Sequence, residues 1–350
     1  MNFADYLTQK LPAVEAEIMR GLPAAPAVPA AAASAPSERT RADLNTYLYQ
    51  PLAHFSAGGG KRVRPVLCCL GTEAVGGSAE AALPVACAIE DFQSAALIHD
   101  DIADKSELRR GEKCLYKTLG TGLAINVGDS ALVNVVRRVT VADHLSDQLK
   151  IRVIDALLAM QEHTLEGQAL DLGWAQNERW DVTSEQYLFM ALSKTAYYSA
   201  AYPLVLGALI GGADQKTLDA LKEFGLKVGL AFQLQDDLLN LVGNAQVQGK
   251  DFRSDITEGK RTLAVVYALE HLDPAEKTEL VSILSAHTSD TLKLQRAVEF
   301  MESANAIKFV RTHALALVDE AKHVLENVIL TEDARDTLLS MADFFVNRER

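Results

Sequence analysis

The chain has 350 residues, 49% of them hydrophobic and 23% charged, and its 47 acidic and 34 basic side chains give a formal net charge of −13. The hydrophobic fraction is too high for a disordered chain. The negative charge argues against general nucleic-acid binding, because proteins that bind phosphate backbones carry the opposite balance. The four cysteines have no metal-binding spacing, and we interpret them as reduced core thiols of a cytoplasmic protein: Cys68, Cys69, Cys87 and Cys114.

The N-terminal region divides into two predicted segments. Residues 2–21 have a helical pattern with interspersed charges, so we expect a helix and no signal peptide. Residues 22–37 form an Ala/Pro-rich connector that cannot pack a core. We therefore predict an N-terminal helix and connector over residues 1–37, followed by one domain over residues 38–350.

From residue 38 onward the apolar residues recur at helical spacing, and strand signals are nearly absent. Thr183 with Gln186 resembles a capping box, and Asp214 is a possible N-cap. The uncharged stretch 195–213 contains Pro203 and the Gly211–Gly212 pair, which favours a broken core helix over a membrane span. The predicted helices cover residues 39–55, 61–75, 79–105, 113–119, 122–145, 147–170, 183–203, 215–243, 259–271, 275–287, 290–303, 305–327 and 331–349.

Two aspartate-rich segments indicate a metal site. Asp100 and Asp104 share one helical face at the end of an apolar helix, with Asp101 beside them. Crowded carboxylates are unfavourable at a helix C-terminus unless a cation neutralises them. A lone segment of this kind would be read as a solvated acidic turn. However, Asp236 and Asp237 form a second acidic pair inside another apolar helix, where unpartnered carboxylates are expensive. Such all-oxygen ligands suit Mg²⁺ that also contacts substrate phosphates.

Basic residues lie where phosphate groups would then be expected. Residues 58–65, GGGKRVRP, form a glycine turn that leads into cations at a helix start, which favours an anion, although a basic capped turn alone is the alternative. Further cations follow each aspartate segment along the chain, and one lies within an apolar helix: Arg109, Arg110, Lys194, Lys250 and Lys260.

These motifs in this order resemble the trans-type isoprenyl diphosphate synthases, the polyprenyl synthetase family. The resemblance covers about residues 45–270. It rests on six segments: GGGKRVRP at 58–65, LIHDDIADKSELRRG at 97–111, EGQALDL at 166–172, SKT at 193–195, FQLQDDLLNLVG at 232–243 and GKDFRSDITEGKRTL at 249–263. The resemblance implies an all-α antiparallel helix bundle around a deep central cavity, usually a homodimer. It also implies Mg²⁺-dependent head-to-tail condensation of isopentenyl diphosphate with an allylic diphosphate.

The resemblance also implies a role for each matching residue. The metal ligands, for three Mg²⁺, would be Asp100, Asp101, Asp104, Asp236 and Asp237, with Gln168 and Asp171 supporting the water shell. The isopentenyl diphosphate site would comprise Lys61, Arg64, Arg110 and Gln93. The allylic diphosphate would contact Arg109, Lys194, Thr195, Gln233, Lys250 and Lys260. The residues expected to carry the catalysis are Asp100, Asp104, Arg109, Lys194, Thr195, Gln233 and Asp236.

Two departures from the family pattern affect these expectations. Asn240 stands where the second motif usually has a third aspartate, which predicts weaker metal binding there. Gln93 stands where the isopentenyl site often has histidine, and glutamine can still donate a hydrogen bond to phosphate.

Product length is predicted from the helix that carries the first motif. A growing prenyl chain would run from Asp100 toward the N-terminus of this helix. The small side chains of Ala95 and Ala96, one turn before Asp100, would let it pass, and the ring of Phe92, one turn further, would stop it. This favours geranylgeranyl diphosphate, with farnesyl or longer products as alternatives and Phe92 in helix packing as the competing interpretation. A terpene cyclase or head-to-head enzyme would not call for two cationic clusters. A non-catalytic regulatory subunit would be expected to lose an aspartate motif, and both are retained.

Overall fold

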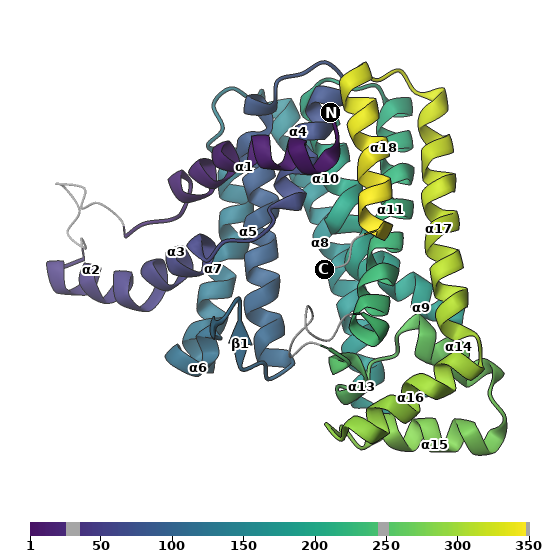
Figure 1. The fold of residues 1–350 in the computed structure, drawn as a ribbon. Coiled ribbons are helices and arrows are strands. Elements are labelled where there is room, and N and C mark those ends of the chain that lie inside the picture. Colours follow the sequence, from purple (N-terminus) through teal and green to yellow (C-terminus); the bar gives the residue numbers. More distant parts are fainter. Residues whose placement is uncertain (26–35, 244–251, 348–350) are drawn as a thin grey trace. The chain divides into compact units, whose positions relative to one another are not determined.

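The structure is a computed structural model that describes residues 1–25, 36–243 and 252–347. These residues form helices and one short hairpin (Figure 1), which confirms the predicted all-α class. The chain divides into two compact units. The N-terminal unit comprises Asp5–Leu157 and Leu206–Gly212, and the C-terminal unit comprises Met1–Ala4, Leu158–Val205 and Ala213–Arg350.

Most helices lie close to their predicted positions. Up to the end of α8 they are α1 (Phe3–Arg20), α2 (Glu38–Leu44), η1 (Asn45–Tyr49), α3 (Gln50–Ala57), α4 (Val63–Ala74), α5 (Ala79–Ala103), β1 (Leu108–Arg109), β2 (Glu112–Lys113), α6 (Leu115–Leu119), α7 (Thr121–Thr140) and α8 (Asp147–Gln176). The remainder are α9 (Ser184–Ala191), η2 (Leu192–Ala201), α10 (Tyr202–Ile210), α11 (Gln215–Val242), α13 (Ser254–Thr257), α14 (Leu263–His271), α15 (Pro274–Ser285), α16 (Thr291–Ser303), α17 (Ala306–Val324), η4 (Leu325–Asn327) and α18 (Glu332–Asn347).

Local sequence signals account for several helix ends. The Thr183–Gln186 capping box begins α9, and the Asp214 side chain accepts a hydrogen bond from the Thr217 N–H at the start of α11, as predicted. The uncharged stretch 195–213 forms most of a π-helix, η2, followed by α10, and Gly211 and Gly212 end it. The predicted boundary between residues 37 and 38 stays a prediction, and most of the predicted connector (residues 26–35) lies outside the described residues.

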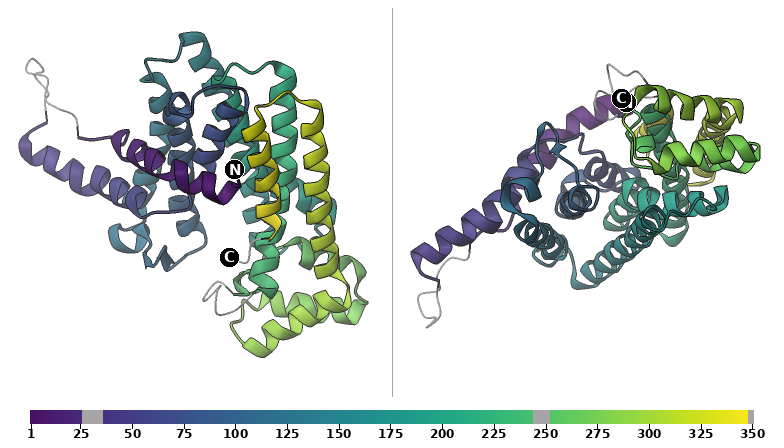
Figure 2. Two further views of the ribbon diagram at one scale, coloured as in Figure 1. Left: turned by 45° about the horizontal axis from the view of Figure 1, so that its top comes forward. Right: turned by 90° about the horizontal axis from the view of Figure 1, so that it is seen from below.

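In the N-terminal unit, α5 is the central helix and packs against α4 and α7, alongside which it runs in Figure 2. Among the described helices, α5 is the one long and apolar enough to cross a membrane, but 72% of its apolar window is buried within the protein. A buried core helix explains this composition. Its last turn therefore emerges from a rigid core and carries the first aspartate motif.

A short hairpin follows α5 and was not predicted. Leu108 pairs with Lys113 and Arg109 with Glu112 in antiparallel register, so the helix predicted over 113–119 begins only at Leu115. The two strands are too short to show an alternating pattern. The turn between them places Arg110 and Gly111 at positive φ.

In the C-terminal unit, α11 packs against η2 and α17, and α14, α15 and α16 gather at one end of it (Figure 1). Gly167 on α8 permits a close approach to η2, because a Cβ atom there would lie 2.2 Å from the backbone nitrogen of Lys194. This approach brings the QxxDL segment of α8, residues 168–172, beside the SKT segment of η2, residues 193–195.

Candidate active site

The first aspartate motif lies at the C-terminal end of α5. Asp101 is 1% exposed, and its Oδ1 accepts hydrogen bonds from Arg109 Nε at 3.0 Å and Nη2 at 2.6 Å. Asp104 is the C-cap, and its N–H donates to the Asp100 carbonyl at 2.8 Å. The hairpin after α5 thus returns Arg109 to the carboxylate eight residues earlier, a pairing that the sequence analysis had not specified.

The second carboxylate oxygen of Asp101 is in an environment that would suit a divalent cation. Its Oδ2 is buried and has no hydrogen-bond partner among the described residues. A buried oxygen of this kind is costly unless a cation or donor completes it. Within the same described residues, no three His, Cys, Asp or Glu side chains converge around a point that could hold a metal ion.

The glycine turn between α3 and α4 carries the predicted phosphate-binding cations. Gly59 and Gly60 have φ values of 77° and 144°, which favour glycine. Lys61 is exposed immediately before α4, and Arg64 lies half-buried in its first turn. A Cβ atom at Gly60 would lie 3.2 Å from Arg110 Nη2, so the absence of a side chain brings this turn next to Arg110.

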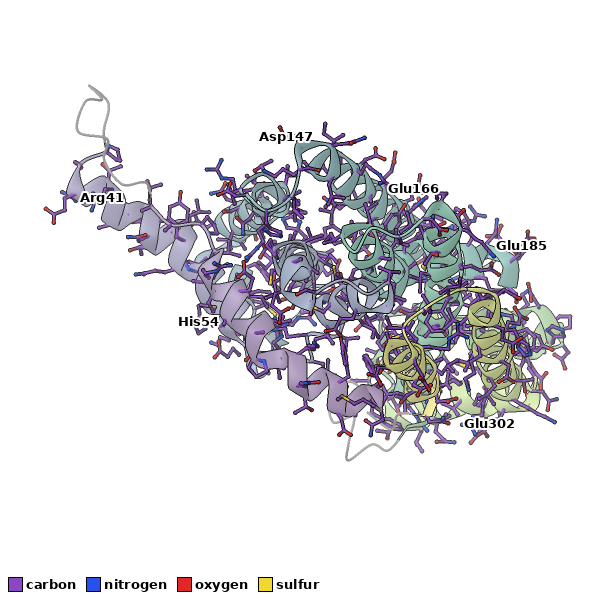
Figure 3. The ribbon with its side chains drawn as sticks, turned by 90° about the horizontal axis from the view of Figure 1, so that it is seen from above. Arg41, His54, Asp147, Glu166, Glu185 and Glu302 are labelled. Atoms are coloured by element: carbon purple, nitrogen blue, oxygen red, sulfur yellow. The ribbon has the colours of Figure 1, made fainter. Side chains whose placement is uncertain are left out.

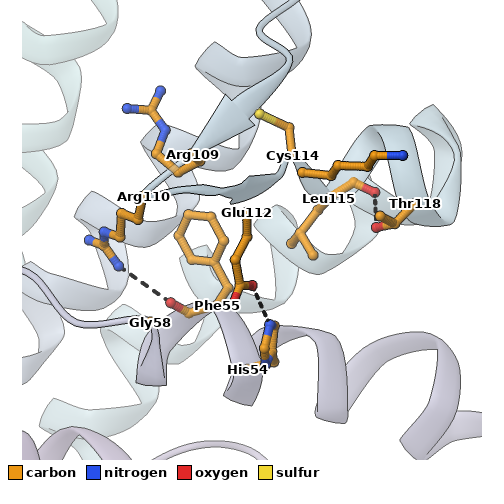
Figure 4. A pocket seen from close by; sticks show the side chains of 10 residues that line it. His54, Phe55, Gly58, Arg109, Arg110, Glu112, Cys114, Leu115 and Thr118 are labelled. Atoms are coloured by element: carbon orange, nitrogen blue, oxygen red, sulfur yellow. Dashed lines mark hydrogen bonds and ion pairs between the residues drawn. The ribbon is translucent and has the colours of Figure 1, made fainter. Parts of the chain in front are cut away.

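Arg110 projects from the hairpin toward the end of α3, where its Nη1 donates to the Phe55 carbonyl at 3.4 Å (Figure 4). Partial burial and the nearby charge of Arg62 lower the pKa of Arg110 below its usual value. An anion bound here would relieve that repulsion. The adjoining cavity of about 190 Å³ is lined by His54, Phe55, Gly58, Arg109, Arg110, Glu112, Lys113, Cys114, Leu115 and Thr118.

Gln93 lies on α5, one turn after Glu90. Its Oε1 is buried and has no hydrogen-bond partner in the part of the chain that the structure describes. A glutamine amide held in this way retains donor and acceptor capacity for a ligand.

The same helix carries the three predicted chain-length residues. Phe92 is 3% exposed, Ala96 is half-buried, and Ala95 packs in the core cluster with Ile98 and residues of α7.

The second aspartate motif lies in α11 within the C-terminal unit. Both oxygens of Asp237 accept hydrogen bonds, from Tyr187 Oη at 2.5 Å and from Gln233 Nε2 at 2.7 Å, and Thr195 Oγ1 donates to Gln233 Oε1 at 2.7 Å. Burial, with the nearby charge of Asp255, raises the pKa of the Asp237 carboxyl to about 7, although both hydrogen bonds act in the opposite direction. Asp237 therefore serves as the centre of a polar network, while Asp236 is less buried.

Lys194, the cation within an apolar helix, has a carboxylate partner. Lys194 Nζ forms an ion pair with Asp171 Oδ2 of the QxxDL segment. Gln168 lies one turn earlier on α8. The ion pair joins η2 to α8 and holds an ammonium group next to Thr195.

The segment after the second motif adds an acidic residue that the sequence analysis did not assign. Asn240 Nδ2 donates to Ser254 Oγ at 2.9 Å, and Asn240 Oδ1 accepts from the Asp255 N–H at 3.2 Å. Asp255 Oδ1 in turn accepts from Lys260 Nζ at 3.2 Å. Asn240 thus binds its own chain, and Asp255 supplies a carboxylate near the position where the motif lacks one. Lys250 lies outside the described residues.

The family model described as polyprenyl synthetase matches residues 45–301. The chain belongs to the polyprenyl synthetase family. It is 40% identical over 299 residues to a short chain isoprenyl diphosphate synthase of Methanothermobacter thermautotrophicus, covering 85% of this chain and 89% of the relative. These findings confirm the predicted family and prenyltransferase class.

Solved structures of the family are similar over nearly the whole chain. The geranylgeranyl pyrophosphate synthetase of Pyrococcus horikoshii has a TM-score of 0.86 at 30% identity, covering 99% of this chain and 98% of that chain. A geranylgeranyl pyrophosphate synthase of Corynebacterium glutamicum, complexed with isoprenyl diphosphate and magnesium, has a TM-score of 0.79 at 29% identity, covering 98% of this chain and 97% of that one. The individual residue roles and the convergence of the two aspartate motifs on one cavity stay predictions.

Proposed function

We propose that this prenyltransferase condenses isopentenyl diphosphate with an allylic diphosphate, head to tail, and releases pyrophosphate. The observation that carries the proposal lies within the N-terminal unit. There the buried carboxylate of Asp101, held by Arg109, adjoins a separate cationic site made by the glycine turn and Arg110. One diphosphate would bind at the aspartates and the other at the glycine turn, so the two substrates have different anion sites.

Magnesium is the proposed cofactor, because the aspartate motifs supply the carboxylate oxygens that it prefers. Its proposed ligands are Asp100, Asp101 and Asp104 in one unit and Asp236 and Asp237 in the other, with three ions as the proposed number. When bound, magnesium supplies the Lewis-acid neutralisation that lets a diphosphate leave.

The chain's own residues then have distinct tasks. Arg109 and Lys194 would add positive charge to the allylic diphosphate, and the Lys194–Asp171 ion pair fixes the direction of that charge. Gln233 Oε1 accepts from Thr195 and retains a second lone pair, which can stabilise a developing allylic cation. We assign no side chain as general base, because the leaving pyrophosphate can accept the proton.

The proposed main product is geranylgeranyl diphosphate. Ala96 and Phe92 lie one and two turns before Asp100 on α5, so a growing chain would pass Ala96 and meet the Phe92 ring. Ala95 packs in the core cluster, so its side chain is less suited than that of Ala96 to line the path of the growing chain. Ala96→Phe should shorten the main product to fifteen carbons and Phe92→Ala should lengthen it, as measured by product chromatography. An unchanged product in Phe92→Ala would place the floor elsewhere.

We further propose that the protein is a homodimer. Ile151, Leu158 and Leu165 recur at heptad spacing on α8, and each is more than half exposed. Figure 3 labels Asp147, where α8 begins, and Glu166, which directly follows Leu165 in the sequence. An apolar stripe at this spacing is typical of helices that pair with another helix. We also propose a cytoplasmic location, in line with four buried cysteines that form no disulfide within the described residues.

The central experiment is incubation of the purified protein with isopentenyl diphosphate and each of dimethylallyl, geranyl and farnesyl diphosphate, with Mg²⁺ or with EDTA. We expect Mg²⁺-dependent pyrophosphate release and products longer by whole isoprene units. Turnover of an allylic diphosphate without isopentenyl diphosphate would favour a cyclase. Absence of turnover with every starter would favour a regulatory subunit.

A further inference from the structure

Helix α5 buries two consecutive acidic residues, which is an uncommon arrangement. Glu90 and Asp91 are 4% and 2% exposed, and each forms an ion pair with a different buried arginine. A buried ion pair is weak evidence for stability, because desolvation can exceed the attraction between the charges. What each pair positions is therefore a separate question from what it adds to stability.

The Asp91 pair anchors the N-terminal helix. Arg138 Nε donates to Asp91 Oδ2 at 2.5 Å, and its Nη2 donates to the Ile18 carbonyl at 2.9 Å at the end of α1. Asn134 Nδ2 donates to Asp91 Oδ2 at 2.6 Å and to the Gly21 carbonyl at 3.1 Å. Within the described residues, the hydrogen bonds of this pair lead to Asn134 and to the carbonyls of α1 rather than to a proposed substrate residue.

The Glu90 pair instead holds the glycine turn. Arg62 Nη1 donates to Glu90 Oε1 at 2.6 Å, and Arg62 Nη2 donates to the Ser56 carbonyl at 2.6 Å. Ser56 lies near the end of α3 and Arg62 is the N-cap of α4, so one guanidinium group closes the turn between them. Arg62 has a φ of 48°, a conformation that costs free energy in a non-glycine residue and requires support from its surroundings.

The position of Arg62 links this pair to the anion site. The buried Arg62 directly follows the exposed Lys61, and Arg64 is two residues further on. Arg62 is itself 4% exposed, with two of its nitrogens already donating within the protein. It is therefore placed to orient its neighbours rather than to bind a ligand.

We propose that the Glu90–Arg62 pair is a positioning device that presents Lys61 and Arg64 to the diphosphate of isopentenyl diphosphate. The proposal rests on the proposed function of this site. It requires arginine specifically, because the planar guanidinium group donates to Glu90 and to the Ser56 carbonyl at once. A lysine side chain is flexible and ends in one ammonium group, which cannot reproduce this geometry. It also requires the charge of Glu90, which offsets a buried cation beside Arg110.

The test compares Arg62→Lys and Glu90→Gln with the matched variants Arg138→Lys and Asp91→Asn. Both pairs are buried and involve adjacent residues of one helix, so they control for lost stability. The readouts are the Kd for isopentenyl diphosphate alone in EDTA, KM for each substrate, kcat and the thermal midpoint. We expect Arg62→Lys to raise the Kd and KM for isopentenyl diphosphate roughly tenfold, or about 1.4 kcal/mol, with KM for the allylic substrate unchanged.

The matched variants should lower the thermal midpoint without changing either affinity. Glu90→Gln should act like Arg62→Lys but more weakly, because glutamine keeps the hydrogen-bond acceptor, and it serves as the test if Arg62→Lys does not fold. Equal affinities in all four variants and wild type would overturn the proposal and leave an ordinary structural ion pair. The Kd measurement needs no turnover, so an inactive wild-type protein that binds isopentenyl diphosphate would refute the proposed function alone.

Discussion

Replacing Tyr187 with phenylalanine removes one hydroxyl group from the network around the second aspartate motif. Tyr187 is 2% exposed, and its hydroxyl donates to Asp237 Oδ2 at 2.5 Å. Phenylalanine fills the same space, so no cavity forms. Among the described residues, the Gln233 amide is then the one remaining donor to the Asp237 carboxylate.

The magnitude follows from the burial of that carboxylate. A hydrogen bond to a charged group contributes about 1.5–3 kcal/mol, and the acceptor left behind cannot be rehydrated freely. Burial already raises the pKa of Asp237 to about 7, so part of the cost can be avoided by protonation near neutrality. We therefore expect a loss of about 1.5–2 kcal/mol, which for a chain of 350 residues corresponds to a fall of roughly 2–3 °C in the thermal midpoint.

Thermal unfolding followed by circular dichroism, in EDTA, measures this loss. Tyr47→Phe is the control, because Tyr47 is 50% exposed and undergoes the same chemical change at the surface. We also expect a lower kcat, because Thr195 and Gln233 belong to the same network. A Tyr187→Phe midpoint equal to that of Tyr47→Phe would refute the argument that this bond orders the motif.

Three further predictions concern the metal sites and the dimer. Asp100→Ala should lower kcat by about 10²–10³, as loss of one preorganised charge contact does, and wild-type turnover would remove Asp100 from the metal ligands. Asn240→Asp loses the donor to Ser254 and adds charge near Asp255, so the metal-free variant should be less stable and Mg²⁺ should raise its thermal midpoint more than that of wild type. An equal Mg²⁺ effect in both proteins would show that position 240 does not contribute to metal binding. Leu158→Glu should convert the dimer to a monomer with unchanged helicity, as measured by light scattering and circular dichroism, whereas a wild-type monomer would contradict the proposed interface.

Much of the local structure could be predicted from the sequence. Helical periodicity depends on neighbours three and four residues apart, and a capping box such as Thr183–Gln186 lies within one turn, so both are visible in the chain itself. The motif order likewise sufficed for the family and for the prenyltransferase class. The helix ends were less accurate, as at α8, which extends to Gln176, because packing rather than propensity determines where a helix stops.

The partners of the charged side chains were decided by the tertiary structure. Asp237 bonds to Tyr187, fifty residues earlier, and Glu90 pairs with Arg62 across two helices. Local sequence patterns do not identify such pairs. A buried charge requires a partner, but the partner can come from any segment that the fold brings next to it. The same reasoning applies to Asn240. Its sequence position suggested a weak metal ligand, whereas the fold uses its amide to hold Ser254 and Asp255.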